Sequence, residues 1–369
     1  MPLAFSTLGC PGDSLAQVIA TAHAAGAAGL EIRVADGEFA YPGMDVAART
    51  AVVRQLNDAG ITVLSVASYV KICEPLDVRA PGLRKCDGGT LTSSHAAAAG
   101  AAATDGTADG TPDGTAVAAA TGATAPDAAG AAGGADGTGA APTVGDDHDE
   151  LGANDPVLGD LLAAVELCAE LSAGNTPAGT SDTGNPQTGP QLRVFPGAGL
   201  EPCDVGAAPS AELAAADRLG AQRLNLAAQR ARELGVTILL ETHDSHPRAC
   251  DIVRILAHVD AAAPVKVIWD LMHPWRYDEA PTRTAELLTD SVAYAQYKDG
   301  VRNPGTNSVT LTLPGEGELP LLAMRDLVAE TLAARGISDP WVCLEWERAW
   351  HPELPPVSEA LGSLTKALA

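Results

Sequence analysis

Positive charge is scarce in this chain of 369 residues. Lysine and arginine together number 23, against 47 aspartate and glutamate residues, so the formal net charge at pH 7 is −24. Proteins that hold DNA or RNA without sequence preference do so through lysine and arginine contacts to the phosphates. The acidic balance therefore argues against a nucleic-acid partner, and the net charge mainly favours solubility.

Paired cysteines and long apolar runs are also missing. The seven cysteines are scattered, odd in number and free of CxxC spacing, which in a chain of this length indicates reduced thiols rather than a disulfide framework. The N-terminal residues lack the basic region and sustained apolar run of a secretory signal. No stretch approaches 18 uninterrupted apolar residues, so we expect no membrane span. These absences predict a soluble, cytoplasmic protein.

Large apolar side chains are nearly absent from residues 78–152. This stretch consists mostly of Ala, Gly, Thr, Asp and Pro, and residues 86–150 contain ten acidic residues but no lysine or arginine. Such a composition cannot bury enough apolar surface to offset the entropy that ordering would cost. We therefore predict a disordered, low-complexity insertion at 78–152, and a shorter flexible loop insertion at 174–191.

The rest of the chain alternates between short apolar runs and amphipathic, alanine-rich segments. Residues that cap helix N-termini, Ser14, Asp45, Asp155 and Ser210, precede several of these segments. Without the two insertions, strands and helices alternate eight times over a core of the size typical of a (β/α)₈ TIM barrel. We predict one such domain over 1–369, with the long insertion after strand three and the short one before strand four. The expected strands are 3–8, 29–34, 61–70, 192–196, 236–241, 265–270, 292–298 and 341–347, and the helices are 15–25, 45–57, 157–173, 210–234, 247–260, 282–289, 319–335 and one from 357.

Polar side chains end four of these strands. Glu241 closes VTILLE, Asp270 closes VKVIWD, Gln296 lies in VAYAQYKD and Glu345 in WVCLEWE. Any one acid alone is as readily explained by pairing with a nearby Arg or Lys, and Gln296 alone by ordinary hydrogen bonding. Because a parallel barrel builds its site from the C-terminal ends of its strands, we expect the four to converge. Three carboxylates and an amide oxygen in one place predict a divalent cation.

Further polar residues are expected at the same rim. His243 and His273 follow Glu241 and Asp270 closely, and imidazoles there can contact metal or substrate. Charged groups after strands two and seven can clamp hydroxyl, carboxylate or phosphate groups of a substrate, although Arg302 is equally well explained as a solvated loop charge. The candidate substrate-binding residues are His243, His273, Lys298, Arg302, Glu31 and Arg33.

Most familiar catalytic motifs are absent: the chain has no GxGxxG after a strand, no GxxxxGK[ST], no GxSxG and no HExxH. The order ETHD, WDxxHP, QxKDG, GEG and LEWE instead resembles the sugar phosphate isomerase/epimerase family of xylose isomerase-like TIM barrels. The resemblance covers residues 1–77 and about 153–369. It implies a metal held by Glu241, Asp270, Gln296 and Glu345, with Gln at a position where that family usually has His, and Glu347 on the same strand face as Glu345.

The resemblance also implies a reaction class. A divalent cation, Mn²⁺ first and Mg²⁺ or Co²⁺ as alternatives, would stabilise an enediolate while Glu241 and Glu345 exchange a proton with a small carbohydrate substrate. Such an enzyme is an isomerase or epimerase. A hydro-lyase of the inosose-dehydratase kind on the same metal site is the main alternative. An endonuclease IV-like enzyme, which needs more histidines and a basic groove, and a non-catalytic sugar-binding barrel are less favoured. The sequence leaves homo-oligomerisation open.

Overall fold

The computed structural model describes residues 1–76, 155–174 and 189–369. All of these residues belong to one compact unit of the chain. The insertion predicted at 78–152 lies outside the described residues. So does most of the loop predicted at 174–191, of which Gly174 and residues 189–191 are described.

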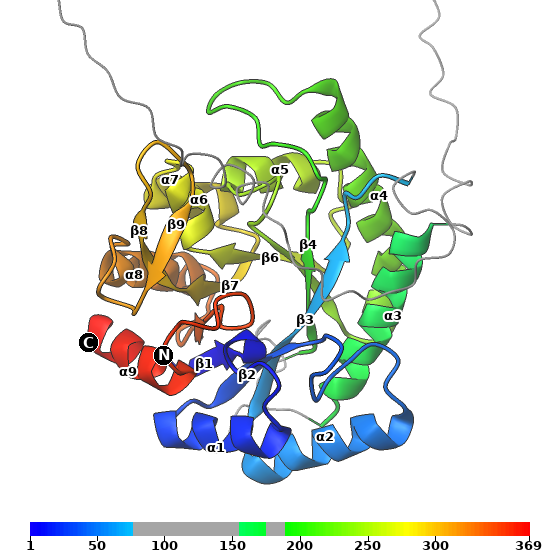
Figure 1. The fold of residues 1–369 in the computed structure, drawn as a ribbon. Helices are drawn as coiled ribbons and strands as arrows, with labels where there is room; N and C mark the ends of the chain where they lie inside the picture. The colour runs from blue at the N-terminus through cyan, green and yellow to red at the C-terminus, as the bar shows by residue number, and fades with distance from the viewer. Residues whose placement is uncertain (77–154, 175–188) are drawn as a thin grey trace, which may run out of the picture. The chain divides into compact units, whose positions relative to one another are not determined.

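Eight parallel strands of the described residues close into a barrel, as the sequence predicts. The strands neighbour one another in the order β1-β10-β7-β6-β5-β4-β3-β2. Each barrel strand therefore pairs with the next one along the chain, and β10 pairs with β1 to close the barrel. Figure 1 shows the barrel with helices packed around it. The barrel strands are β1 (Leu3–Ser6), β2 (Gly29–Arg33), β3 (Thr62–Lys71), β4 (Gln191–Phe195), β5 (Thr237–Glu241), β6 (Val265–Asp270), β7 (Val292–Tyr297) and β10 (Val342–Leu344).

The helices begin where the sequence supplies capping residues. Ser14 and Gln17 form a reciprocal capping box, and Asp155 accepts hydrogen bonds from two backbone amides of the first turn that Pro156 opens. These side chains satisfy amides that have no partner inside the helix. The helices are α1 (Leu15–Ala25), α2 (Val46–Ala59), α3 (Pro156–Leu171), α4 (Ala211–Glu233), α5 (Ala249–Leu256), α6 (Met272–Arg276), α7 (Pro281–Leu288), α8 (Leu321–Ala333) and α9 (Val357–Ala367). None of the helices in the described ranges is both long and apolar enough to cross a membrane.

Several boundaries differ from the sequence-based ones. The predicted strand 3–8 ends at Ser6, because the chain turns into a 3₁₀-helix, η1 (Thr7–Gly9). The predicted strand 341–347 is only three residues long, so Glu345 follows it directly. The sequence also gave no prediction of α6 or of the antiparallel hairpin of β8 (Asp299–Arg302) and β9 (Val309–Thr312).

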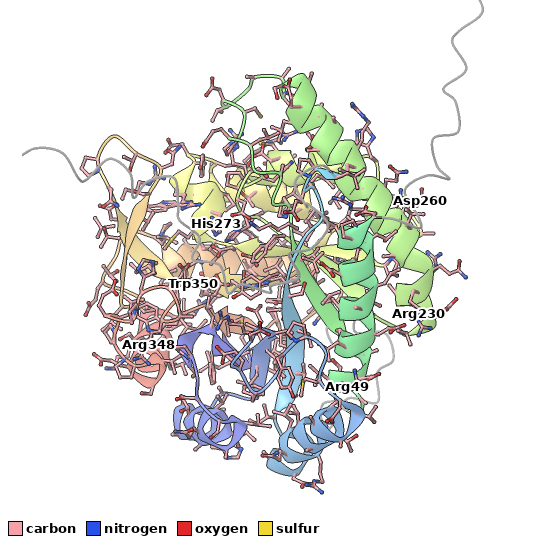
Figure 2. The ribbon with its side chains drawn as sticks, turned by 45° about the vertical axis from the view of Figure 1, so that its right-hand side comes forward. Arg49, Arg230, Asp260, His273, Arg348 and Trp350 are labelled. Atoms are coloured by element: carbon pink, nitrogen blue, oxygen red, sulfur yellow. The ribbon has the colours of Figure 1, made fainter. Side chains whose placement is uncertain are left out.

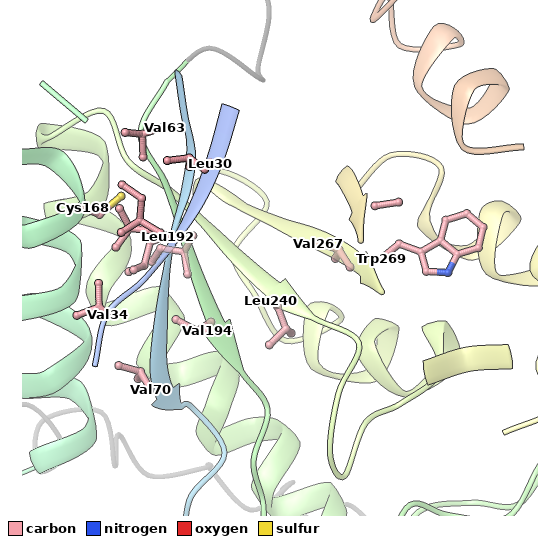
Figure 3. Packing of buried hydrophobic residues seen from close by; sticks show 14 of the residues in the cluster. Leu30, Val34, Val63, Val70, Cys168, Leu192, Val194, Leu240, Val267 and Trp269 are labelled. Atoms are coloured by element: carbon pink, nitrogen blue, oxygen red, sulfur yellow. The ribbon is translucent and has the colours of Figure 1, made fainter. Parts of the chain in front are cut away.

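Strand alternation separates two apolar layers. Outward residues such as Leu240, Val267 and Trp269 pack in a large core under the helices, and Figure 3 shows Cys168 of α3 close to Leu192 of β4 there. Inward residues form a second, smaller cluster inside the barrel. This inner cluster consists of Ala4, Leu64, Leu239, Ile268, Ala293, Tyr294, Trp341 and Cys343.

The inner cluster forms the floor of the candidate site. Because successive side chains point to opposite faces of a strand, the residue two positions after an inward residue points inward again, one layer higher. Leu239, Ile268 and Cys343 belong to the inner cluster. Two residues after them come Glu241, Asp270 and Glu345, which explains why the three acids share one layer.

Candidate metal centre

Three carboxylates from β5, β6 and the end of β10 converge inside the barrel mouth. Glu241 and Asp270 are fully buried, and Glu345 is 4% exposed. One carboxylate oxygen from each lies within 4.8 Å of the others. Carboxylates buried this deeply are costly unless they are paired, hydrogen-bonded or metal-bound, so their partners decide what the cluster can do.

Two buried cations contact the cluster. Arg193 Nη1, from β4, lies 3.2 Å from Glu345 Oε1 and 3.4 Å from Glu241 Oε2. Lys298 Nζ, just after β7, lies 2.8 Å from Asp270 Oδ2 and 2.5 Å from Glu345 Oε2. The same ammonium also reaches Glu347 Oε1 at 2.5 Å. Lys298 therefore lies within the predicted site, among its acids.

Glu31 and Gln296 form a second layer of contacts on the β2 side of the cluster. Glu31 is fully buried and accepts hydrogen bonds from Tyr294 Oη at 2.6 Å and from Gln296 Nε2 at 3.1 Å. Gln296 Nε2 also donates to Glu345 Oε1 at 3.2 Å. Arg193 Nη1 lies 3.8 Å from Glu31. Glu31 therefore orients Gln296 and Arg193, which both contact Glu345.

The acidic side chains in and around this cluster outnumber the basic ones. Glu31, Glu241, Asp270, Glu345 and Glu347 carry up to five negative charges, whereas Arg193 and Lys298 supply two positive ones. The surplus is therefore up to three negative charges, at a position where water screens poorly. Protonation of a carboxyl or binding of a cation would relieve this surplus.

The acids respond differently to this environment. Burial, together with repulsion by Glu345, raises the pKa of Glu241 well above its usual 4.5 despite the attraction of Arg193. Burial also raises the pKa of Asp270 to about 6, against the attraction of Lys298. Burial alone would raise the pKa of Glu345 too, but Lys298 and Arg193 outweigh it and hold that pKa at about 2. The cluster therefore contains one firmly ionised carboxylate beside two that readily hold protons.

The two predicted histidines face Glu241. One ring nitrogen of His243, one of His273 and one oxygen of Glu241 all lie within 4.8 Å of one another. The imidazole rings meet edge to face with centroids 4.5 Å apart, and Phe195 lies 4.4 Å from the His243 ring. Burial lowers the pKa of His273 well below 6.5, so its ring is neutral at pH 7.

The two predicted arginines lie outside the cluster. Arg33 pairs with Glu38, donates to Tyr69 Oη at 2.7 Å and lies over the Trp350 ring at 5.0 Å. Arg302, on β8, pairs with Asp278 and with the backbone carbonyl of Trp275, whose ring it covers at 4.1 Å. Figure 2 shows His273 and Trp350 within the body of the molecule, whereas Arg49 and Arg230 lie on outer helices.

Some residues of the site were missed from the sequence. Arg193 interrupts the apolar strand LRVF, and a charge in the middle of a buried strand is a visible signal that it faces other charges. Tyr294 gives no such signal, because tyrosine is common in strands. His246, which follows Glu241 closely in sequence, turns away instead: its Nε2 lies 2.6 Å from Asp217 of α4.

The residues present fit a divalent cation. Neither oxygen of Glu241 accepts a hydrogen bond from any described residue, and neither ring nitrogen of His273 has a hydrogen-bond partner there. Gln296 Oε1 is likewise buried without a partner in the described chain. Carboxylate and amide oxygens with imidazole nitrogens are ligands suited to Mn²⁺, Co²⁺ or Zn²⁺.

Comparison with known proteins agrees with this architecture. A family model described as xylose isomerase-like TIM barrel matches residues 155–367. The chain belongs to this family. A search among curated proteins finds no match.

Solved structures of the same fold are similar over the whole chain. A zinc-bound IOLI protein has a TM-score of 0.57 at 14% identity, covering 100% of this chain and 96% of that one. A D-psicose 3-epimerase from Clostridium cellulolyticum H10 has a TM-score of 0.57 at 12% identity, covering 100% and 98%. A probable 3-DHS dehydratase, AsbF, from Bacillus anthracis has a TM-score of 0.54 at 12% identity, covering 100% and 98%. At such identities the likeness establishes the fold alone.

Proposed function

We propose that this family member is a divalent-metal-dependent isomerase or epimerase that acts on a sugar or sugar derivative by proton transfer through an enediolate. The observation that carries the proposal is the convergence of Glu241, Asp270 and Glu345, with both Glu241 oxygens lacking a hydrogen-bond partner among the described residues. Epimerases among the solved structures of this fold, such as the D-psicose 3-epimerase, point the same way.

The proposed metal ligands are Glu241, Asp270, Gln296 and Glu345. Gln296 would contribute through Oε1, since its Nε2 is directed at Glu31 and Glu345. A bound divalent cation, Mn²⁺ in first place, supplies Lewis-acid stabilisation of the negative charge that develops on substrate oxygens during proton removal. Asp270 is held for this role by its neighbours: its Oδ1 accepts from Met272 N at 2.8 Å, which fixes the carboxylate plane.

Glu241 and Glu345 are the proposed proton-transfer pair. Glu345 accepts hydrogen bonds from Arg193, Gln296 and Lys298, at 3.2, 3.2 and 2.5 Å. These donors stabilise its carboxylate form. Glu241 accepts no hydrogen bond from the described residues, although Arg193 Nη1 lies 3.4 Å from its Oε2, so it can take up a proton and return it at low cost. Two carboxyl groups with such different environments suit a reaction that removes a proton at one point and replaces it at another.

The remaining polar groups would position the substrate. Lys298, within reach of Asp270, Glu345 and Glu347, can donate to a substrate oxygen that displaces one of these contacts. His243 and His273 offer ring nitrogens beside Glu241. Arg33 and Arg302, engaged with Glu38 and Asp278, would bind substrate only after leaving those partners.

Solvent-deuterium incorporation tests the proposal. The Mn²⁺-loaded protein would be incubated in D₂O with a panel of ketoses and sugar derivatives, and products would be followed by NMR. We expect deuterium at a carbon beside the carbonyl, lost in Glu241→Gln and Glu345→Gln but kept in the surface control Glu166→Gln. Full exchange in both site variants would refute the proton-transfer roles.

Analysis of the products in the same experiment distinguishes an isomerase or epimerase from the main alternative, a hydro-lyase. A hydro-lyase removes a hydroxyl group as water, so its product is dehydrated, whereas an isomerase or epimerase keeps the substrate's formula. The probable 3-DHS dehydratase AsbF shares this fold, and a dehydrated product would assign this chain to the hydro-lyases instead.

A further inference from the structure

We propose that Glu241, His243 and His273 form a binding position of their own for a divalent transition-metal ion, with two imidazole nitrogens and one carboxylate oxygen as ligands. This position shares Glu241 with the acid cluster but does not depend on the reaction proposed above. Each of the three residues offers one ligand atom, and these three atoms all lie within 4.8 Å of one another.

His273 supplies the strongest observation. The residue is 6% exposed, and neither ring nitrogen has a hydrogen-bond partner in the described parts of the chain. A buried imidazole without partners loses free energy relative to water. Asp270 Oδ2 lies 3.6 Å from His273 Nε2 and already contacts Lys298. An ion bound by His273 would satisfy a nitrogen that the protein leaves free.

His243 is held in place for the same task. Its backbone exchanges two hydrogen bonds with His246, at 3.1 and 2.9 Å, which pins the turn after β5. Asp244, in the middle of that turn, adopts a φ of 47°, an unusual conformation for a residue other than glycine. Asp244 Oδ1 lies 2.8 Å from His243 Nδ1. Despite this closeness, His243 Nδ1 is buried and makes no hydrogen bond to any described residue.

The spacing is close to what an ion requires. Three atoms that lie at most 4.8 Å from one another can each lie within about 2.8 Å of a common centre, whereas zinc–nitrogen bonds measure about 2.1 Å. The side chains therefore need to close by less than ~1 Å each to reach bonding distance.

The ligand set selects the kind of ion. Two imidazoles with one carboxylate favour Zn²⁺, Co²⁺ or Mn²⁺ over Mg²⁺ and Ca²⁺, which prefer all-oxygen sites. The acid cluster is different in kind, because its ligands are oxygens and its charge is partly balanced by Arg193 and Lys298. The two positions should therefore respond differently to substitution.

Cadmium NMR tests the inference without any activity measurement. The full-length, metal-stripped protein would carry ¹⁵N-labelled histidine and would be titrated with ¹¹³Cd²⁺. We expect a cadmium resonance split into a triplet by two histidine nitrogens, reduced to a doublet in His243→Gln and in His273→Gln. The triplet should persist in the control variant His258→Gln and in Asp270→Asn, with circular dichroism confirming that each variant is folded.

Other outcomes would overturn the inference. Cadmium resonances without nitrogen splitting in the wild type, or a triplet that survives both His243→Gln and His273→Gln, would show that these imidazoles bind no ion. A third pattern would refute the metal centre of the proposed function and leave the histidine position standing. In that pattern the triplet is present, but Asp270→Asn changes neither the cadmium resonances nor the deuterium exchange.

Discussion

Removing the charge of Asp270 should stabilise the metal-free protein at neutral pH. Burial raises the pKa of this carboxyl from 3.8 to about 6. A carboxyl with a raised pKa binds its proton more tightly in the folded state, so its contribution to stability is complete below pH 3.8 and falls as the pH rises to about 6. At 1.36 kcal/mol per pH unit, the total loss is about 3 kcal/mol, of which about 1.4 kcal/mol falls between pH 5 and pH 7.5.

Asp270→Asn isolates this contribution. The amide oxygen can still accept from Met272 N, and Lys298 keeps Glu345 and Glu347 as partners. Thermal unfolding in EDTA, followed by circular dichroism at pH 5 and pH 7.5, measures the effect. Relative to wild type, the variant should gain ~2 °C more at pH 7.5 than at pH 5. The exposed control Asp58→Asn should show no such difference, and equal shifts at both pH values for Asp270→Asn would refute the reasoning.

Three further outcomes are expected. Glu241→Gln and Glu345→Gln should each lower deuterium exchange by at least about 100-fold, since general acid–base catalysis contributes that much or more, with unchanged circular dichroism. Gly317→Ala should destabilise by about 1–3 kcal/mol in urea unfolding, because its Cβ would lie 2.2 Å from Asp299 Oδ1; Gly159→Ala, in open space on α3, should not. Arg223→Met should cost about 3–5 kcal/mol by leaving buried Asp155 without its 2.6 Å partner, whereas Arg230→Met on the exposed face of α4 should leave the free energy of unfolding nearly unchanged.

The sequence predicts the barrel because its local signals agree with one another. Ser14, Asp45, Asp155 and Ser210 all cap helices as expected. Strand ends were less predictable, because a strand stops where its pairing partners stop. Glu345 follows β10 for this reason, although the apolar pattern continues to Trp346.

The sequence likewise predicts some residues of the candidate site and not others. The convergence of Glu241, Asp270 and Glu345 follows from strand alternation, which the sequence displays. The position of Lys298 among these acids does not, because it depends on how a long side chain turns after β7. The sequence predicts Arg302 at the rim because it follows the same strand. The hairpin of β8 and β9, which local propensity did not reveal, holds it beside Asp278 and Trp275.

Anomalous X-ray scattering from crystals of the Mn²⁺-loaded protein tests the central claim most directly. We predict an anomalous peak within bonding distance of oxygens from Glu241, Asp270 and Glu345, about 2.0–2.3 Å away, with Arg193 and Lys298 displaced from at least one of these carboxylates. A map with no peak among the three acids, and with both cations still paired to them, would contradict the proposed metal centre.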